Sequence, residues 1–395
     1  MESHPIAKQI EDLFRVTMAP ISFFMGSTYA KRAGDPAISD FVAGNPHDMP
    51  IPELAEAFRK WSVPQHKDWF AYTDNHPAAR ESVAKTLSAE RGESYDPEDI
   101  FLTPGTFGAL SVSLRVIADK GDEILYISPP WFFYEAMILL AGGSPGRIMT
   151  KPPAFDLDLD AVAAAITSRT RGIIVNSPNN PSGRILTPAT LQGLADVLRE
   201  ASKRNGRRIY LLSDESYRRI LFDGNTFTSP ADYYDDTFTL YTYGKTLLAP
   251  GQRIGYVALN PRMADREIIR NGMFLSQVVG GWQFPNAVLQ YALPDLEPAS
   301  VDVAHLQARR DRVVAALREM GYEANSPEST FYILVRSPIA DDWAFTEMLA
   351  EHDVFVLPGR VFELPGYFRI SITANDEMID RSFPGFEKAL KQARG

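Results

Sequence analysis

The chain has 395 residues, of which 45% are hydrophobic and 23% are charged, and its formal net charge at pH 7 is -10. It contains no cysteine, which excludes disulfide bonds, a thiol nucleophile and a thiolate metal site. The negative charge argues against nucleic acid as the main partner, because phosphate binding needs a basic surface. No apolar run reaches membrane-spanning length and the start lacks the apolar segment of a signal peptide, so we expect a cytoplasmic protein with no membrane partner.

A chain of this length exceeds what one hydrophobic core usually supports, so we expect two domains. Its first 45 residues are interpreted as an irregular stretch that packs on the second domain. From about residue 99 to residue 259, short apolar runs alternate with helical periodicity, which predicts βαβ units and a mostly parallel sheet. The expected strands are DIFLT, DEILYIS, GIIVNS, IYLLSD, FTLYTY and RIGYVAL.

Two helices are expected between these strands. One is FGALSVSLRVIA, after Gly105, and the other is TPATLQGLADVLREASKR, for which Thr187 is the predicted N-cap. From about Asn286 the pattern changes to a long helical stretch, HLQARRDRVVAALREM, followed by short, separated strands in TFYILVRS, VFVLPG and YFRISIT. This second pattern predicts a smaller α+β domain.

Polar residues follow the predicted strands of the sheet. In an open α/β sheet, ligands bind just beyond the carboxyl ends of the strands. The segments at these positions are PGTFGAL, PPWFFY, SPNNPSG, DESY and YGKTLLAPGQR. Together they offer a glycine-rich turn into a helix, an aromatic cluster, an asparagine, an aspartate, a lysine and an arginine. This convergence is more than a core requires, and it predicts a ligand site.

Each member also has a purely structural explanation. Gly105, Thr106 and Phe107 could form an ordinary strand-to-helix turn, although the free N–H groups of a helix start favour a phosphate. Trp131, taken alone, is more typical of a core or a domain interface. Asp214 could cap a helix that begins at the next residue.

Arg253 could pair with a surface carboxylate, but Lys245 is harder to explain in structural terms. It follows an apolar run that reads as a buried strand, so its amine has to lose water, find a counter-charge or react.

Taken in order, the motifs resemble one family, the fold-type I pyridoxal-phosphate (PLP) enzymes, and within it the aspartate aminotransferase-like class I/II aminotransferases. The matching motifs are AGNP (43–46), SPNNPSG (177–183), DESY (214–217), GKTLLAPGQRIGY (244–256), TFYILV (330–335), VLPG (356–359) and FRIS (368–371). The resemblance implies an α/β large domain, residues 46–290, with a mostly parallel seven-stranded sheet flanked by helices. Residues 1–45 and 291–395 would form the small α+β domain, and the protein would be a homodimer with shared active sites.

The resemblance also implies roles around the PLP ring. Lys245 matches the lysine that binds the cofactor covalently and later moves a proton. Asp214 matches the carboxylate that faces the pyridine nitrogen and keeps it protonated. Asn180 and Tyr217 match the pair that hydrogen-bonds the phenolic oxygen of PLP, and Trp131 matches the aromatic residue that stacks on its ring.

The cofactor's phosphate would be held by Gly105, Thr106, Phe107, Thr242 and Arg253, which lie in or beside the matched motifs.

Two further predictions concern the partner subunit and the substrate. Tyr72 resembles a catalytic-site tyrosine that reaches the phosphate of the neighbouring subunit. Gly44, Asn180 and Arg369 match the residues that bind the substrate, and the planar guanidinium of the arginine suits the α-carboxylate.

The chain departs from the family pattern at several positions. The usual glycine after the tyrosine is absent, and His76 and Pro77 stand in that region. Thr330 takes the place of a small residue, and Arg360 replaces a small hydroxyl residue after VLPG. Arg360 could contact the substrate or be a surface charge, and Glu363 has no assigned role.

The reaction implied by the resemblance is transfer of an amino group from an α-amino acid to an α-keto acid. A PLP-dependent lyase, decarboxylase or oxidase on the same fold is the alternative, because the cofactor chemistry is shared. A further alternative is a non-enzymatic regulator that senses an amino acid. Such regulators carry a basic DNA-binding domain ahead of this fold, which we do not expect here because the motifs begin by residue 45.

Substrate preference can be predicted from one missing charge. In dicarboxylate-specific members, an arginine shortly before a helix start pairs with the distal carboxylate of the substrate. The matching stretch, FLSQVVGGWQFPNAVLQ (274–290), has no basic residue and offers Trp282 and Phe284 instead. An unpaired carboxylate there loses solvation, whereas an apolar side chain gains by burial. We therefore expect neutral and large or aromatic substrates, unless Arg360 or Arg32 supplies the charge.

Overall fold

The computed structural model describes residues 5–281 and 283–395 of the chain, and its centre is a seven-stranded sheet. In spatial order the strands are β2 (Ile100–Thr103), β8 (Gly255–Leu259), β7 (Thr237–Thr242), β6 (Tyr210–Asp214), β5 (Thr170–Asn176), β3 (Glu123–Ser128) and β4 (Ser144–Met149). Only β8 runs antiparallel to its two neighbours, so the prediction of a mostly parallel seven-stranded sheet is confirmed.

The edge strand β4 was not among the strands expected from the sequence. Its sequence, SPGRIM, contains a proline and a glycine, and most of its residues are partly exposed. A proline is tolerated there because an edge strand pairs on one side only, so the usual pattern of a buried strand is missing.

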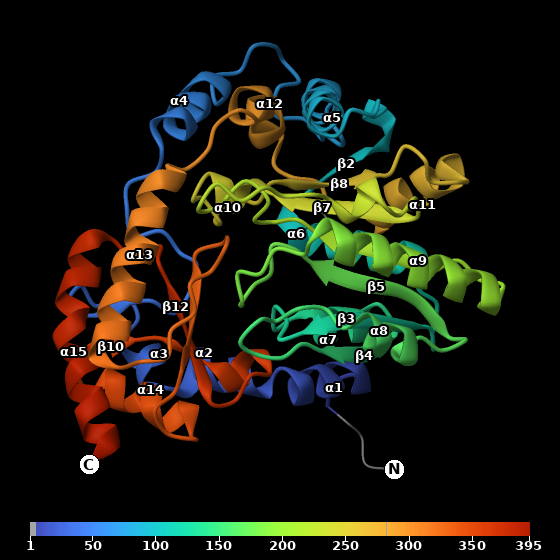
Figure 1. Cartoon of the computed structure of the whole chain (residues 1–395). Helices are drawn as coiled ribbons and strands as arrows, with labels where there is room; N and C mark the ends of the chain where they lie inside the picture. The colour runs from blue at the N-terminus through green and yellow to red at the C-terminus, as the bar shows by residue number, and fades with distance from the viewer. Residues whose placement is uncertain (1–4, 282) are drawn as a thin grey trace.

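Helices cover both faces of this sheet (Figure 1). One face packs on α6 (Gly105–Ile117), α7 (Tyr134–Leu140) and α11 (Arg266–Val279). The other packs on α4 (Pro52–Trp61), α5 (Pro77–Arg91), α8 (Leu159–Ala165), α9 (Pro188–Asn205) and α12 (Ala287–Leu296). Within β3, Ile124 belongs to the first core and Leu125 to the second, as alternation in a doubly covered sheet requires. The predicted cap of α9 is confirmed, because the Thr187 side chain accepts from the Thr190 N–H.

A second group of elements lies beside the sheet and carries its own core (Figure 1). Its strands are β9 (Tyr332–Arg336), β11 (Leu357–Pro358) and β12 (Tyr367–Ser371), which form an antiparallel sheet, and β1 (Ser39–Asp40) and β10 (Val354–Phe355), which pair in parallel. Its helices are α13 (Val303–Met320), α14 (Asp342–Ala350) and α15 (Asp376–Arg394). The late strands expected from the sequence are present, and the exact domain boundaries stay a prediction.

The expectation that the first 45 residues are irregular is wrong. They contain α1 (Lys8–Val16), α2 (Met18–Gly26) and α3 (Thr28–Arg32). Helix α2, with the sequence MAPISFFMG, is apolar around nearly its whole circumference and therefore lacks the one-sided pattern that identifies a surface helix. It packs beside α14 through Phe23 and Trp343, whereas α1 lies along α7, where Gln9 donates to the carbonyls of Leu139 and Leu140.

Four neighbouring strands end on polar residues at one edge of the sheet. Ser128 ends β3, Asn176 ends β5, Asp214 ends β6 and Thr242 ends β7. Asn176 and Asp214 are register partners, so their side chains start from adjacent positions. These strands run parallel to one another, which brings their carboxyl ends to the same side, facing the second group of elements.

Candidate active site

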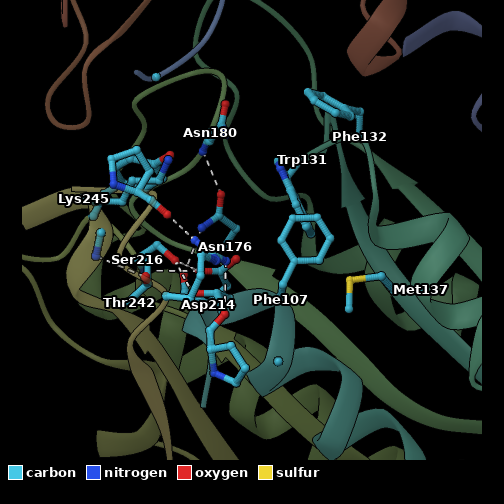
Figure 2. Close-up of a pocket in the computed structure, with 18 of the residues that line it drawn as sticks. Phe107, Trp131, Phe132, Met137, Asn176, Asn180, Asp214, Ser216, Thr242 and Lys245 are labelled. Atoms are coloured by element: carbon cyan, nitrogen blue, oxygen red, sulfur yellow. Dashed lines mark hydrogen bonds between the residues drawn. The ribbon is translucent and has the colours of Figure 1, made fainter. Parts of the chain in front are cut away.

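A cavity of about 750 Å³ lies at the carboxyl ends of these strands. Figure 2 shows part of its lining, with Lys245, Asp214 and Asn180 grouped opposite the aromatic side chains of Trp131 and Phe107. The residues predicted from the sequence that line it are Gly44, Thr106, Phe107, Trp131, Asn180, Asp214, Tyr217, Thr242, Lys245, Arg253 and Arg369. Residues more than three hundred positions apart therefore meet in one place.

Lys245 lies on α10 (Tyr243–Thr246), a single turn that directly follows β7. The turn is held by Thr242, whose Oγ1 accepts from the Gly244 N–H at 3.2 Å. The Nζ atom lies 5.8 Å from the ring centroid of Tyr217 and 5.9 Å from that of Phe331. Among the described residues, Lys245 has no ion-pair partner within 4.0 Å, so the ammonium faces the cavity without a salt bridge.

Asp214 is buried and is held by two hydroxyl groups. Its Oδ2 accepts from the phenol of Tyr134 at 2.6 Å, and its Oδ1 accepts from Ser216 Oγ at 2.6 Å and from the Ser216 N–H at 3.2 Å. Burial raises the pKa of Asp214, while these hydrogen bonds and the charge of Lys245 act in the opposite direction. The residues after it form a turn, so the explanation of Asp214 as a helix cap is wrong.

The SPNNPSG loop places Asn180 between the sheet and Arg369. The Asn180 N–H donates to Asn176 Oδ1 at 2.7 Å, and Asn176 Nδ2 donates to the Asp214 carbonyl at 2.9 Å. Arg369 Nη1 donates to Asn180 Oδ1 at 2.9 Å. Asn176 was not predicted as a site residue, although its place at the end of a buried strand is the signal that could have identified it.

The start of α6 forms a cradle of hydrogen-bond donors. Gly105 has a φ of +72°, and a Cβ there would lie 3.0 Å from Arg253 Nη2 and 3.2 Å from Thr242 Oγ1. Thr106 Oγ1 lies 2.8 Å from Ser216 Oγ. Arg253 donates only to two backbone carbonyls and has no carboxylate partner among the described residues, which contradicts the surface ion-pair explanation. The cradle therefore combines the N–H groups of a helix start, the hydroxyls of Thr106 and Thr242 and the uncompensated guanidinium of Arg253. Such a set of donors suits a phosphate group.

Arg369 is the second uncompensated guanidinium of the cavity. It is 4% exposed, its Nη2 donates to the Val42 carbonyl at 2.9 Å, and its Nε has no hydrogen-bond partner in the described structure. Burial lowers the pKa of Arg369. A buried guanidinium with an unused donor suits an incoming carboxylate.

Tyr332, which sequence reasoning missed, lies directly under Arg369. The guanidinium carbon is 3.9 Å from its ring centroid, and Tyr217 Oη donates to its Oη at 3.4 Å. A Cβ on Gly44 would lie 2.5 Å from Tyr332 Oη and 3.5 Å from Lys245 Nζ, which explains why that position is glycine. The sequence signal was the tyrosine of TFYILV, which could not be separated from core residues by pattern alone.

The far wall of the cavity is apolar. The rings of Phe107 and Trp131 meet edge to face with centroids 4.5 Å apart, and Phe24 of α2 lies 6.1 Å from Phe132. Met137 extends this wall. Phe24 and Phe132 were not predicted. The sequence indicated no helix around Phe24, and within the PPWFFY segment only the tryptophan was assigned a role.

Four residues with open roles lie outside the cavity. Arg360 forms ion pairs with Asp341 and Asp342, and Arg32 forms ion pairs with Asp35 and Asp353, so neither supplies a charge to the cavity in this chain. Glu363 accepts from Tyr126 and Ser128. His76 precedes α5, and its N–H donates to Gln290 Oε1 at 2.9 Å.

Tyr72 also lies outside the cavity, in a second hollow that Phe284 helps to line. Its side chain is 91% exposed. Trp282, which we expected near the substrate, lies outside the described residues. Within the described ranges no helix is long and apolar enough to cross a membrane, and no group of His, Asp or Glu side chains could hold a metal ion.

Comparison with known proteins places this geometry in a family. Residues 37–383 match the model of aminotransferase class I and II. The chain is 32% identical to the aspartate/prephenate aminotransferase of Thermus thermophilus, with 89% of this chain and 91% of that protein covered, and 28% identical to aromatic-amino-acid aminotransferase 2 of Thermococcus litoralis, with 88% and 90% covered. Its fold matches the crystal structure of an aminotransferase from Eubacterium rectale with a TM-score of 0.87, at 28% identity and full coverage of both chains.

The chain therefore belongs to the class I and II aminotransferases, a family of PLP-dependent transaminases. This membership decides among the alternatives that the sequence left open, in favour of a transaminase over a lyase, decarboxylase, oxidase or non-enzymatic regulator.

Proposed function

We propose that this chain binds PLP in the cavity and, as a cytoplasmic homodimer, transfers the amino group of large neutral or aromatic α-amino acids to an α-keto acid. The observation that carries the proposal is the meeting of Lys245, Asp214 and two uncompensated guanidinium groups, those of Arg253 and Arg369, around one cavity. The cradle at Gly105 suits the phosphate of the cofactor, and the pocket beside Arg369 suits the substrate carboxylate.

Bound PLP supplies an electron sink for the charge left on the α-carbon of the substrate. Asp214 would keep the ring nitrogen protonated, and Trp131 would pack against the ring. Arg369 and Asn180 would bind the substrate carboxylate on the same side of the cavity as Lys245. The Lys245 amine binds the cofactor in the resting enzyme and then accepts and returns the proton.

The apolar wall supports the choice of substrate. A substrate side chain that extends from the α-carbon away from the phosphate cradle at Arg253 would contact Trp131, Phe132 and Phe24. A second carboxylate there would lose its hydration without gaining a cation, because Arg360 and Arg32 are engaged elsewhere. An aromatic side chain would bury apolar area at about 25 cal/mol per Å².

The proposal is tested by comparing kcat/KM for phenylalanine, leucine, methionine and aspartate with one common keto-acid acceptor. We expect phenylalanine to exceed aspartate. An advantage for aspartate would contradict the proposed specificity, and Arg360→Ala would then show whether that side chain changes its ion pairs to bind the substrate. Loss of all four activities in a preparation that binds PLP would contradict the proposed reaction.

A further inference from the structure

Asp214 and its two hydroxyl neighbours form a directional hydrogen-bond chain. Ser216 Oγ donates to the carboxylate, so its hydrogen is used, and the 2.8 Å contact between Thr106 and Ser216 has Thr106 as the donor. Tyr134 donates to the other carboxylate oxygen from α7. The chain therefore runs from Thr106 through Ser216 to Asp214, with Tyr134 approaching from the opposite side, and both oxygens of the carboxylate are fixed.

Within the described structure, the hydroxyl of Tyr134 serves Asp214 alone. It is 1% exposed, it lies in the core between the sheet and α6, and its phenol has Asp214 as its only hydrogen-bond partner among the described residues. Burial, helped by the negative charge of Asp214, raises the pKa of Tyr134 well above the ordinary value, so the phenol stays a neutral donor. A phenylalanine at this position would fill the same core volume.

The Asp214 carboxylate needs such donors because its other surroundings stabilise its negative charge little. The charged or titratable side chains that face Asp214 are Lys245, Tyr217 and Tyr134, and only Lys245 is a cation. Asn176 binds the backbone carbonyl of Asp214, not its carboxylate. Without hydroxyl donors, a carboxyl group that is 5% exposed favours its neutral form, which cannot hold a proton on a neighbouring ring nitrogen.

We propose that Tyr134 and Ser216 are positioning residues that keep Asp214 ionised and aimed at the ring nitrogen of PLP, with Thr106 orienting Ser216. This inference rests on the proposed role of Asp214 toward the cofactor. It assigns a function in the reaction to two residues that are not predicted to touch the cofactor ring or the substrate. Thr106 belongs to the phosphate cradle, so the same hydrogen-bond chain joins the phosphate site to the ring-nitrogen site.

The test is a titration of the holoenzyme reconstituted with PLP labelled with ¹⁵N in the ring, followed by NMR. The chemical shift of the label reports whether the ring nitrogen is protonated. In Tyr134→Phe and in Ser216→Ala we expect the midpoint of deprotonation to fall by about one to two pH units, since each variant removes one hydrogen bond to a charged group. Asp214→Asn should give the largest fall. The matched control is Tyr126→Phe, another buried tyrosine of the same core whose phenol binds Glu363 instead.

A midpoint in Tyr134→Phe and Ser216→Ala equal to that of the wild type, with a lowered midpoint in Asp214→Asn, would overturn the inference and leave the role of Asp214 intact. An unchanged midpoint in Asp214→Asn would overturn the proposed role of Asp214 itself. A purely structural role would lower the melting temperature of Tyr134→Phe without moving the midpoint. If Tyr134→Phe does not fold, Ser216→Ala decides, because Ser216 lies in a turn at the cavity and not in the core.

Discussion

The guanidinium carbon of Arg369 lies over the ring of Tyr332, 3.9 Å from its centroid. No carboxylate of the described chain neutralises this arginine; Asn180, a backbone carbonyl and the aromatic face hold it in place. A positive charge that is buried in this way is costly unless an anion binds to it. The substrate carboxylate is the anion that the proposed reaction provides.

Replacing this arginine tests that assignment. In Arg369→Lys we expect kcat/KM for phenylalanine to fall by about 100-fold or more, because an ammonium cannot form the paired hydrogen bonds of a guanidinium. PLP affinity should change little, since Arg369 lies away from the phosphate cradle. Arg360→Lys is the matched control, because Arg360 pairs with Asp341 and Asp342 outside the cavity and should leave kcat/KM unchanged. Equal losses in both variants would contradict the assignment.

The phenol beneath Arg369 predicts a pH effect. Burial acts to raise the pKa of Tyr332, but the charges of Lys245 and Arg369 outweigh it, so its pKa is lowered from the ordinary value of 10.0. A phenol with a lowered pKa loses its proton as the pH rises toward 10, and the resulting anion competes with the substrate carboxylate for Arg369. We expect KM to rise at alkaline pH in the wild type and to rise much less in Tyr332→Phe. Parallel KM profiles in the two proteins would show that another group titrates.

Covalent attachment of the cofactor to Lys245 is a direct chemical prediction. Lys245 lies on the turn that directly follows β7 and has no ion-pair partner in the described chain, so its amine is available to the cofactor. Borohydride treatment of the holoenzyme, followed by peptide mapping, should place a pyridoxyl group on Lys245. Lys245→Ala should still bind PLP but should not turn over. A pyridoxyl group on another lysine would show that the assignment is wrong.

Several of the residues that the sequence identified share one feature: each lies at the end of a strand or in the short segment after it. Strand periodicity stops at or shortly before Asp214, Asn180 and Lys245. The carboxyl ends of parallel strands necessarily converge, so these residues come together. Arg253 and Arg369 were found through motif resemblance, because nothing in local periodicity separates them from surface arginines. Their functional roles stay predictions until the variants described here are measured.

The residues that the sequence did not identify depend on packing between distant segments. Tyr134 and Tyr332 look like ordinary core aromatics in a pattern, and only the tertiary structure shows that the Tyr134 hydroxyl binds Asp214 and that the Tyr332 ring lies under Arg369. Phe24 lies on a short helix whose residues are apolar around nearly its whole circumference, so no one-sided apolar stripe predicted the helix.

Phe24, which lies beside Phe132 in the apolar wall, provides a test of substrate selection. Phe24→Ala removes one ring from the apolar wall, so we expect kcat/KM for phenylalanine to fall by about tenfold, with a smaller effect on alanine, whose side chain does not reach the wall. Phe14→Ala is the control, because Phe14 is a 49% exposed phenylalanine of α1 that does not line the cavity. Equal losses for both substrates would mean that Phe24 supports the fold of α2 and does not select the substrate.

Tyr72 leads to a prediction about the dimer. It lies outside its own subunit's cavity and is 91% exposed, and Phe70 and Val278, which line the same hollow, are 64% and 52% exposed. An apolar surface of this kind is typical of a subunit interface. We expect Tyr72→Phe to bind PLP more weakly, because in the proposed dimer this tyrosine would bind the phosphate in the neighbouring subunit.

Mixed dimers distinguish a shared site from a self-contained one. In a hybrid of a Tyr72→Phe subunit and a Lys245→Ala subunit, a shared arrangement leaves one site with both native residues, Lys245 from the first subunit and Tyr72 from the second. We therefore expect activity at limiting PLP to recover above that of either homodimer, toward half of the wild-type value. If Tyr72 served its own subunit, the hybrid would contain no intact site and would not exceed the Tyr72→Phe enzyme. Sedimentation of the wild type as a fully active monomer would contradict the shared site altogether.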